Sequence, residues 1–151
     1  MAEAILKAQL KEKGITGVRV SSSGLSANVG QPISKESNAA LKALSYKPVR
    51  YRAKQFKETD KDTQDLIICM TAAHGRHIGT GDNITSVAAI TGLNDVADPY
   101  GGSLDLYIKT AEYIKYACGD IMAMIIKALS EENKEKEADI KDKKEKKGDE
   151  K

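Results

Sequence analysis

The amino-acid sequence predicts a small α/β domain built on a parallel sheet. Apolar side chains recur at three- and four-residue spacing in several segments, which is typical of amphipathic helices. Short apolar runs lie between them, and one, DLIICM at residues 65–70, lacks the polar alternation of a half-exposed strand. The resulting order of helix, strand, helix, strand, helix, strand, helix favours a parallel sheet covered by helices.

The first half of the chain supplies two helices and one strand. Residues 1–13 carry apolar side chains on one face and Lys and Glu on the other, so we expect a helix ending near Gly14. No Ser, Thr, Asp or Asn precedes this helix, so the chain begins inside it. Residues 18–21 predict a short strand. Ser34 can cap a second helix that runs through about Leu44.

The second half contains the buried strand at residues 65–70, a short helix near 72–78 and a weaker strand at 84–90. The clearest helix follows the sequence DPYGGS. Its inward positions repeat at helical spacing, and they are Tyr107, Ala111, Ile114, Cys118, Ile121, Ile125 and Ala128.

Composition limits the possible classes of function. The chain has 151 residues, 40% of them hydrophobic, which suits one domain with an aliphatic core. A net charge of +2, with basic and acidic residues interleaved, argues against nucleic-acid binding. No apolar run reaches the roughly 20 residues of a membrane span, and no signal peptide is expected. The two cysteines have no spacing typical of a disulfide framework, which favours a reducing, cytoplasmic setting.

The composition changes sharply near Ser130. Residues 130–151 hold eight Lys against nine Asp and Glu, and Ile140 is their single large apolar residue. Such a segment cannot bury enough apolar surface to offset the entropy lost on ordering. We therefore expect a domain at residues 1–129 and a charged tail at 130–151 that is disordered or a frayed helical extension. A docking tail is the less favoured alternative.

Few residues offer chemistry from their spacing alone. Cys69 has Arg76 downstream, but the six residues between them resemble a strand end entering a helix rather than a phosphate-cradling loop. Cys69 and Cys118 therefore fit better as buried core residues than as reactive thiols. His74 and His77 could form half of a metal site, yet nothing spaced to complete it follows, so no metal is expected.

The loop DPYGGS, residues 98–103, is the most specific local feature. Its Pro, aromatic residue and Gly pair stand directly before the long helix. Asp98 could be a general acid, a cap or a turn former, and spacing alone favours the turn former. As a general acid, Asp98 would need a raised pKa and a reacting oxygen within hydrogen-bond reach.

Five stretches in order carry a resemblance to a known family. They are MAEAIL, VSSSGLSANVGQPIS, AALKAL followed by YRAKQF, DLIICMTAAH, and VADPYGGSLDLY. These resemble the first helix, the glycine-containing loop, the second helix with its following stretch, the third strand and the Asp-Pro-aromatic loop of the low-molecular-weight protein tyrosine phosphatases. The likeness covers residues 1 to about 129.

This resemblance implies a three-layer α/β/α fold around a four-stranded parallel sheet. In the family, the central first strand leads into the catalytic signature Cys-x5-Arg-Ser-Pro, and the equivalent of MAEA follows it. Neither that strand nor that loop is present in these residues. The resemblance therefore implies an N-terminally truncated family member, and the chain as given is expected to be inactive.

The family mechanism assigns roles to residues that remain. A thiolate attacks phosphorus to form a phosphocysteine, held by loop amides and an Arg. By resemblance, Asp98 is the general acid that protonates the leaving oxygen, and Tyr100 is the aromatic wall of the substrate entrance. The resemblance implies no cofactor and no metal. The implied partners are phosphorylated proteins or small phosphomonoesters, and neither nucleic acid nor a membrane.

Specificity and alternative functions stay open. Tyr51 stands where many members carry His, and the Gly101-Gly102-Ser103 continuation resembles the bacterial branch that includes protein arginine phosphatases. The substrate is thus phosphotyrosine or, alternatively, phosphoarginine. A further alternative is a non-catalytic phosphatase-like binding protein. A weaker one makes Cys69 and Arg76 a new phosphate loop. An arsenate reductase would need an additional Cys pair, which is absent.

Overall fold

The structure, a computed structural model, describes residues 1–148. The helices are α1 (Ala2–Glu12), α2 (Lys35–Ala43), α3 (Asp60–Thr63), α4 (Ala72–Ile78), α5 (Val87–Thr91) and α6 (Leu104–Gly148). The strands are β1 (Ile67–Cys69) and β2 (Ile84–Ser86). In the described part of the chain, no helix has both the length and the apolar character that a membrane span requires.

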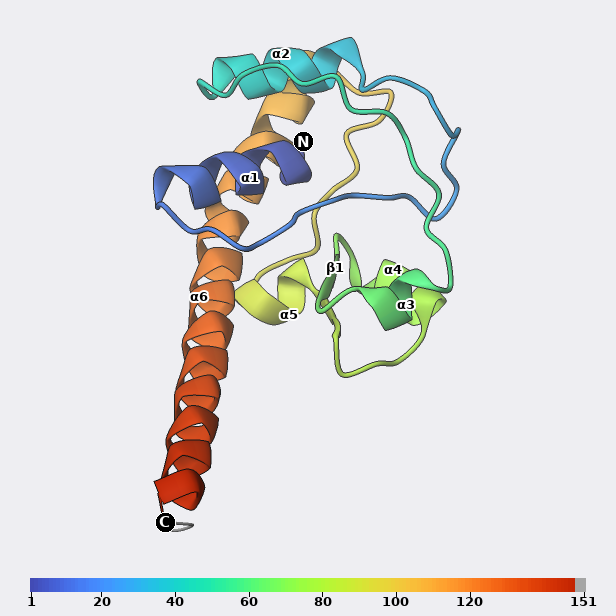
Figure 1. Ribbon diagram of the computed structural model, residues 1–151. Helices are drawn as coiled ribbons and strands as arrows, with labels where there is room; N and C mark the ends of the chain where they lie inside the picture. The colour runs from blue at the N-terminus through green and yellow to red at the C-terminus, as the bar shows by residue number, and fades with distance from the viewer. Residues whose placement is uncertain (149–151) are drawn as a thin grey trace.

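Helix α6 carries the core. Helices α1, α2 and α5 all pack on it, and Figure 1 shows α1 and α2 crossing the end of α6 that follows the loop. The inward stripe that the sequence predicts is buried from Tyr107 to Ile121. The most fully buried large side chains come from four different helices, so the core is aliphatic and shared between them; they are Ile5, Leu41, Val87 and Cys118.

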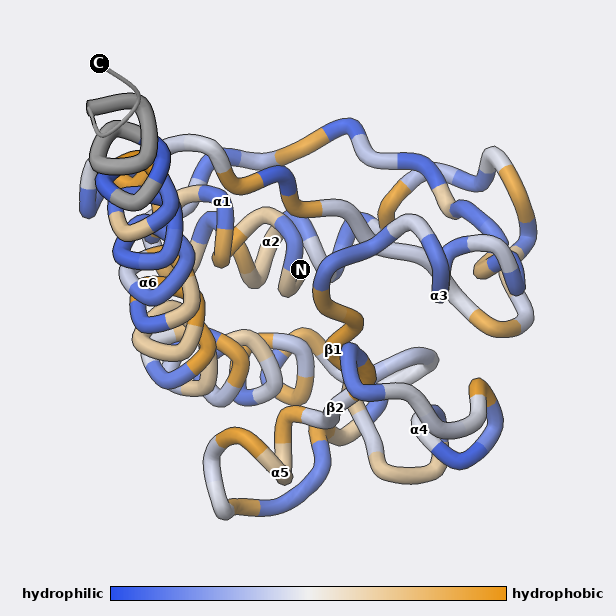
Figure 2. Tube along the Cα trace, turned by 60° about the horizontal axis from the view of Figure 1, so that its bottom comes forward, coloured by the Kyte–Doolittle hydropathy of each residue, from blue (hydrophilic) through white to orange (hydrophobic). Residues whose placement is uncertain are grey.

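The sheet is small and parallel. Strand β1 pairs with β2 in the register Ile67↔Ile84, Ile68↔Thr85 and Cys69↔Ser86. Helix α4 connects the two strands, as a parallel pair requires a crossover. Figure 2 shows β1 as a hydrophobic stretch, in agreement with the apolar run in the sequence. Within residues 1–148 this sheet has two strands, rather than the four that the resemblance implies.

The predicted helices near residues 1–13, 34–44 and 72–78 are confirmed. The predicted cap of the second is confirmed too, because the Ser34 hydroxyl accepts a hydrogen bond from the Ser37 amide at 3.0 Å. The strand predicted over residues 84–90 is correct only for residues 84–86, because a similar cap starts a helix there. The Ser86 hydroxyl accepts from the Ala89 amide at 3.1 Å, so the strand stops there and α5 begins.

The strand predicted at residues 18–21 is not part of a sheet. This segment belongs to no described strand. The sequence pattern also gave no indication of the short helix α3. A strand is defined by its partner's hydrogen bonds, and β-propensity alone cannot supply one. Val18 and Val20 nevertheless remain half-buried against the core.

Two loop segments, residues 24–33 and 49–56, run side by side. Gly24 donates its amide to Lys54 O at 2.9 Å, and Ala53 donates to Gln31 O at 2.8 Å. Isolated bridges join Gly24 with Gln55 and Pro32 with Arg52. These bonds keep residues 49–56 extended although neither segment is a regular strand.

Residues 130–148 continue α6, and the side chains of residues 130–141 are exposed. Figure 2 shows this end of α6 as mostly hydrophilic, whereas the first part mixes hydrophobic and hydrophilic positions. Residues 149–151, the end of the predicted tail, lie outside the described part of the chain. The division between a domain at residues 1–129 and a tail at 130–151 stays a prediction.

Candidate active site

The loop before α6 is a defined turn rather than a loose connection. The Asp98 carboxylate accepts a hydrogen bond from the Tyr100 amide at 3.0 Å, and the Gly102 amide donates to Pro99 O at 2.9 Å. Gly101 has φ of 74°, a left-handed conformation that favours glycine. Asp98 therefore forms the turn that its spacing predicts, and its side chain remains exposed.

Residues just before Asp98 fasten the loop to the end of β1. The Val96 amide donates to Met70 O at 3.0 Å, and the Asp95 carboxylate accepts from the Ala72 amide at 2.9 Å. Val96 is buried in the core. Asp98 thus follows a segment held at the carboxyl end of a parallel strand, which is where open α/β sheets bind ligands.

Helix α6 fastens the chain on both sides of the loop. The Tyr113 hydroxyl donates to Asn94 O, and the Ser103 hydroxyl accepts from the Leu106 amide at 3.3 Å in the first turn of the helix. Between these anchors, Tyr100 is 82% exposed. The structure therefore presents Asp98 and Tyr100 together on a short, doubly anchored loop, with the aromatic ring in solvent.

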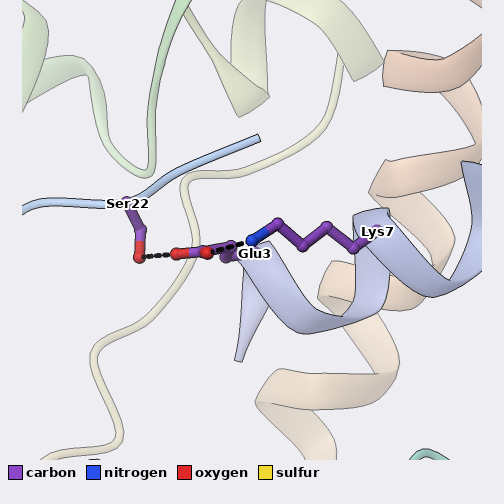
Figure 3. A network of polar contacts seen from close by, with 3 residues as sticks. All are labelled: Glu3, Lys7 and Ser22. Atoms are coloured by element: carbon purple, nitrogen blue, oxygen red, sulfur yellow. Dashed lines mark hydrogen bonds and ion pairs between the residues drawn. The ribbon is translucent and has the colours of Figure 1, made fainter. Parts of the chain in front are cut away.

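A polar network near the start of α1 was not predicted from the sequence. Figure 3 shows the Glu3 carboxylate between two donors: Lys7 Nζ lies 2.6 Å from one oxygen and the Ser22 hydroxyl 2.6 Å from the other. Lys7 Nζ also lies 5.1 Å from the centre of the Tyr51 ring, a cation–π distance. The four-residue spacing of Glu3 and Lys7 could have indicated the ion pair. No sequence signal indicated Ser22.

Glu3 is buried, and its neighbours keep it charged. Burial alone would raise the pKa of this carboxyl, but the hydrogen bonds from Lys7 and Ser22, together with the positive charges of Lys7 and Lys54, outweigh burial and lower the pKa. The same bond to Glu3 raises the pKa of Lys7. The network therefore ties α1 to the extended segment that contains Ser22.

Neither thiol is a suitable nucleophile in these surroundings. Cys69 is 4% exposed and Cys118 is 2% exposed. Burial raises the pKa of the Cys69 thiol, and burial raises the pKa of the Cys118 thiol to about 12. Arg76 is exposed on α4. The predicted reading of both cysteines as core residues is confirmed, and a phosphate loop built on Cys69 has no support.

The two histidines are not part of a group of side chains that could bind a metal ion in the described part of the chain. His74 and His77 are exposed on α4. Among the residues that the structure describes, no group of three or more His, Cys, Asp or Glu side chains could hold a metal ion. The side chains that the loop at residues 98–103 presents at this edge of the sheet are the exposed Asp98 carboxylate and the exposed Tyr100 ring.

Proteins of known family match this chain over most of its length. The family model described as low molecular weight phosphotyrosine protein phosphatase matches residues 1–136. A low molecular weight protein-tyrosine-phosphatase, PtpB, from Staphylococcus haemolyticus is 35% identical over 126 residues, which cover 80% of this chain and 86% of the relative. A protein-arginine-phosphatase from Bacillus subtilis is 27% identical, covering 89% and 90%.

A solved structure agrees with the sequence relatives. The crystal structure of a low molecular weight protein tyrosine phosphatase from T. tengcongensis is similar with a TM-score of 0.75 and 32% identity. The match covers 82% of this chain and 88% of that one. The α/β fold class is thereby confirmed, and the chain belongs to the low molecular weight phosphotyrosine protein phosphatase family.

Proposed function

We propose that this chain contributes the general acid and the substrate wall of a phosphoprotein phosphatase but not its nucleophile. The reaction is hydrolysis of phosphotyrosine through a phosphocysteine, with Asp98 protonating the leaving oxygen and Tyr100 flanking the substrate ring. The observation that carries the proposal is the anchored loop that presents the exposed Asp98 carboxylate beyond the carboxyl end of β1. The reducing cytoplasm suits its two free thiols.

The buried thiols support the absence of a nucleophile from these residues. With a pKa of about 12, Cys118 has a thiolate fraction on the order of 10⁻⁵ at neutral pH. Cys69 is also shielded, and its pKa is raised. No Cys-x5-Arg sequence occurs within the 151 residues. We therefore expect these residues alone to hydrolyse phosphomonoesters no faster than a buffer control.

Phosphoarginine proteins are the alternative substrate, because one relative is a protein-arginine-phosphatase. Tyr100, which is 82% exposed, can lie against a planar phenyl ring or a planar guanidinium group, so it does not distinguish the two substrates. A third possibility is a non-catalytic protein that binds phosphorylated partners. The well-defined loop at residues 98–103, together with the burial of both thiols, favours such a binding protein over a new catalytic site built on Cys69.

A chimera provides the test of Asp98. A family strand followed by Cys-x5-Arg-Ser-Pro is joined ahead of Met1, and kcat is measured with a phosphotyrosine peptide. We expect Asp98→Asn to lower kcat by about 10²–10⁴-fold, because protonation of the leaving oxygen is lost. Asp105→Asn is the matched control, since Asp105 is an exposed carboxylate in the first turn of α6.

The same chimera separates the alternatives. With p-nitrophenyl phosphate, whose leaving group needs little protonation, the Asp98→Asn deficit should shrink. A phosphoarginine peptide measured beside the phosphotyrosine peptide assigns the substrate class. Equal kcat for the Asp98→Asn variant and the unaltered chimera would remove Asp98 from the chemistry. Activity of the 151 residues alone that Cys69→Ser abolishes would contradict the proposed lack of a nucleophile.

A further inference from the structure

Positive charge is concentrated in one part of the sequence. Residues 13–57 contain nine Lys and Arg side chains and a single carboxylate, Glu36. Because the whole chain has a net charge of only +2, the remaining residues are net negative. The overall charge therefore hides a strongly basic region, which includes the paired loop segments at residues 24–33 and 49–56.

The extended backbone of residues 49–56 sorts the side chains of this region by face. Arg50, Arg52 and Lys54 are exposed, whereas the residues between them, Tyr51 and Ala53, are half-buried. Alternate side chains of an extended segment share a face and lie roughly 6.6 Å apart. We call Arg50, Arg52 and Lys54 the basic stripe.

In the described part of the chain, no Lys or Arg of the basic stripe forms a close ion pair, although Lys54 is near enough to Glu3 to help lower the pKa of that carboxyl. The ion pairs there join Lys7 with Glu3, Lys61 with Glu58 and Lys136 with Glu132. The paired segment at residues 24–33 contains no charged residue. Arg52 Nη1 donates to Gly30 O at 2.9 Å, which orients the guanidinium and leaves its remaining donors available.

We propose that the basic stripe binds an extended acidic polypeptide segment with carboxylates at alternate positions. Alternate carboxylates of an extended peptide have the same repeat as the stripe, so several pairs can form in one register. The surface favours a peptide over single-stranded nucleic acid because it lacks stacking platforms. Tyr51 and Phe56 are half-buried, and Lys7 lies over the Tyr51 ring. The proposal goes beyond the phosphatase chemistry and needs no nucleophile.

Fluorescence anisotropy with a labelled peptide of alternating Glu and Ser tests this surface. At low ionic strength we expect the double variant Arg50→Gln/Lys54→Gln to weaken binding about fivefold, as two exposed ion pairs are lost. Lys109→Gln/Lys127→Gln removes the same charge from exposed positions of α6, and we expect its Kd to stay within about twofold of the unaltered chain. Circular dichroism verifies that each variant keeps its helices.

Two further probes make the outcome decisive. A peptide of the same composition with its Glu residues in one block should bind more weakly, and Arg50→Lys should retain binding because the charge remains. Equal weakening by the α6 control variant would overturn the proposal in favour of non-specific attraction. Tighter, stripe-dependent binding of a single-stranded oligothymidylate would overturn it in favour of nucleic acid. Failure of the peptide to bind even at low ionic strength would also refute it.

Discussion

Replacing Glu3 by Gln tests how the start of α1 is held. Glu3 has 8% of its side chain exposed, and its carboxylate contacts Lys7 Nζ and the Ser22 hydroxyl, each at 2.6 Å. An amide can still accept from Ser22 but loses the charge that attracts Lys7. The substitution therefore removes the ionic part of the network while leaving the volume nearly unchanged.

The expected loss follows from the exposure of each partner. A hydrogen bond to a charged group contributes about 1.5–3 kcal/mol, and a solvent-exposed partner reduces that value. Because the Lys7 side chain is 45% exposed, we expect Glu3→Gln to lower the free energy of unfolding by about 1–2 kcal/mol at neutral pH. Lys7 is not stranded in an apolar site by the change, so a larger loss is not expected.

Urea unfolding followed by circular dichroism, at neutral and acidic pH, provides the measurement. The pKa of Glu3 is lowered from 4.5 in the folded protein, so its stabilisation is present above that value and is lost as the pH falls through the folded pKa. The difference between the two proteins should therefore shrink on acidification. Glu12→Gln, at an exposed position of the same helix, is the control. A loss for Glu3→Gln that is the same at both pH values would refute the reasoning.

Three other measurements test the loop and the thiols. Gly102→Ala should destabilise the protein by about 1–3 kcal/mol in thermal unfolding, because the new Cβ would lie 2.6 Å from the Leu106 side chain and 3.0 Å from Pro99 O. Gly119→Ala is the control, and it should be neutral or stabilising because no atom lies close to the new Cβ on α6. Cys69 and Cys118 should react with a thiol reagent only on unfolding, and rapid labelling of the native protein would contradict their burial. Tyr113→Phe should lower the free energy of unfolding in urea by about 1 kcal/mol, because Asn94 O loses the hydrogen bond that the Tyr113 hydroxyl donates.

Local signals in the sequence predicted much of the fold. The helical repeat from Tyr107 to Ile121 became the buried face of α6, and the apolar run at residues 65–70 contains β1. Ser34 was recognisable as a cap because its hydroxyl acts three residues along the chain. The helical repeat and the cap are read from interactions within a few residues, and the apolar run at residues 65–70 indicated a buried strand although its partner β2 lies further along the chain.

Interactions across the chain were the ones that sequence reasoning missed. The segment at residues 18–21 has strand-like residues but no described strand beside it, so its pattern could not decide its state. At the site, Asp98 was identified as a turn former from its own loop, whereas the contact of Ser22 with Glu3 joins residues 19 positions apart. The overall charge also concealed the basic stripe, since averaging over 151 residues removes local asymmetry.

The packing of α1 on α6 has a consequence for how the protein folds. The first helix is synthesised about a hundred residues before the helix that buries its apolar face, so it waits without its main partner during synthesis. A contact that closes such a long loop forms slowly, because the chain loses conformational entropy before the contact stabilises it. We therefore expect docking of α1 to be a late step, and its exposed apolar face to be where a nascent chain is most in need of a chaperone.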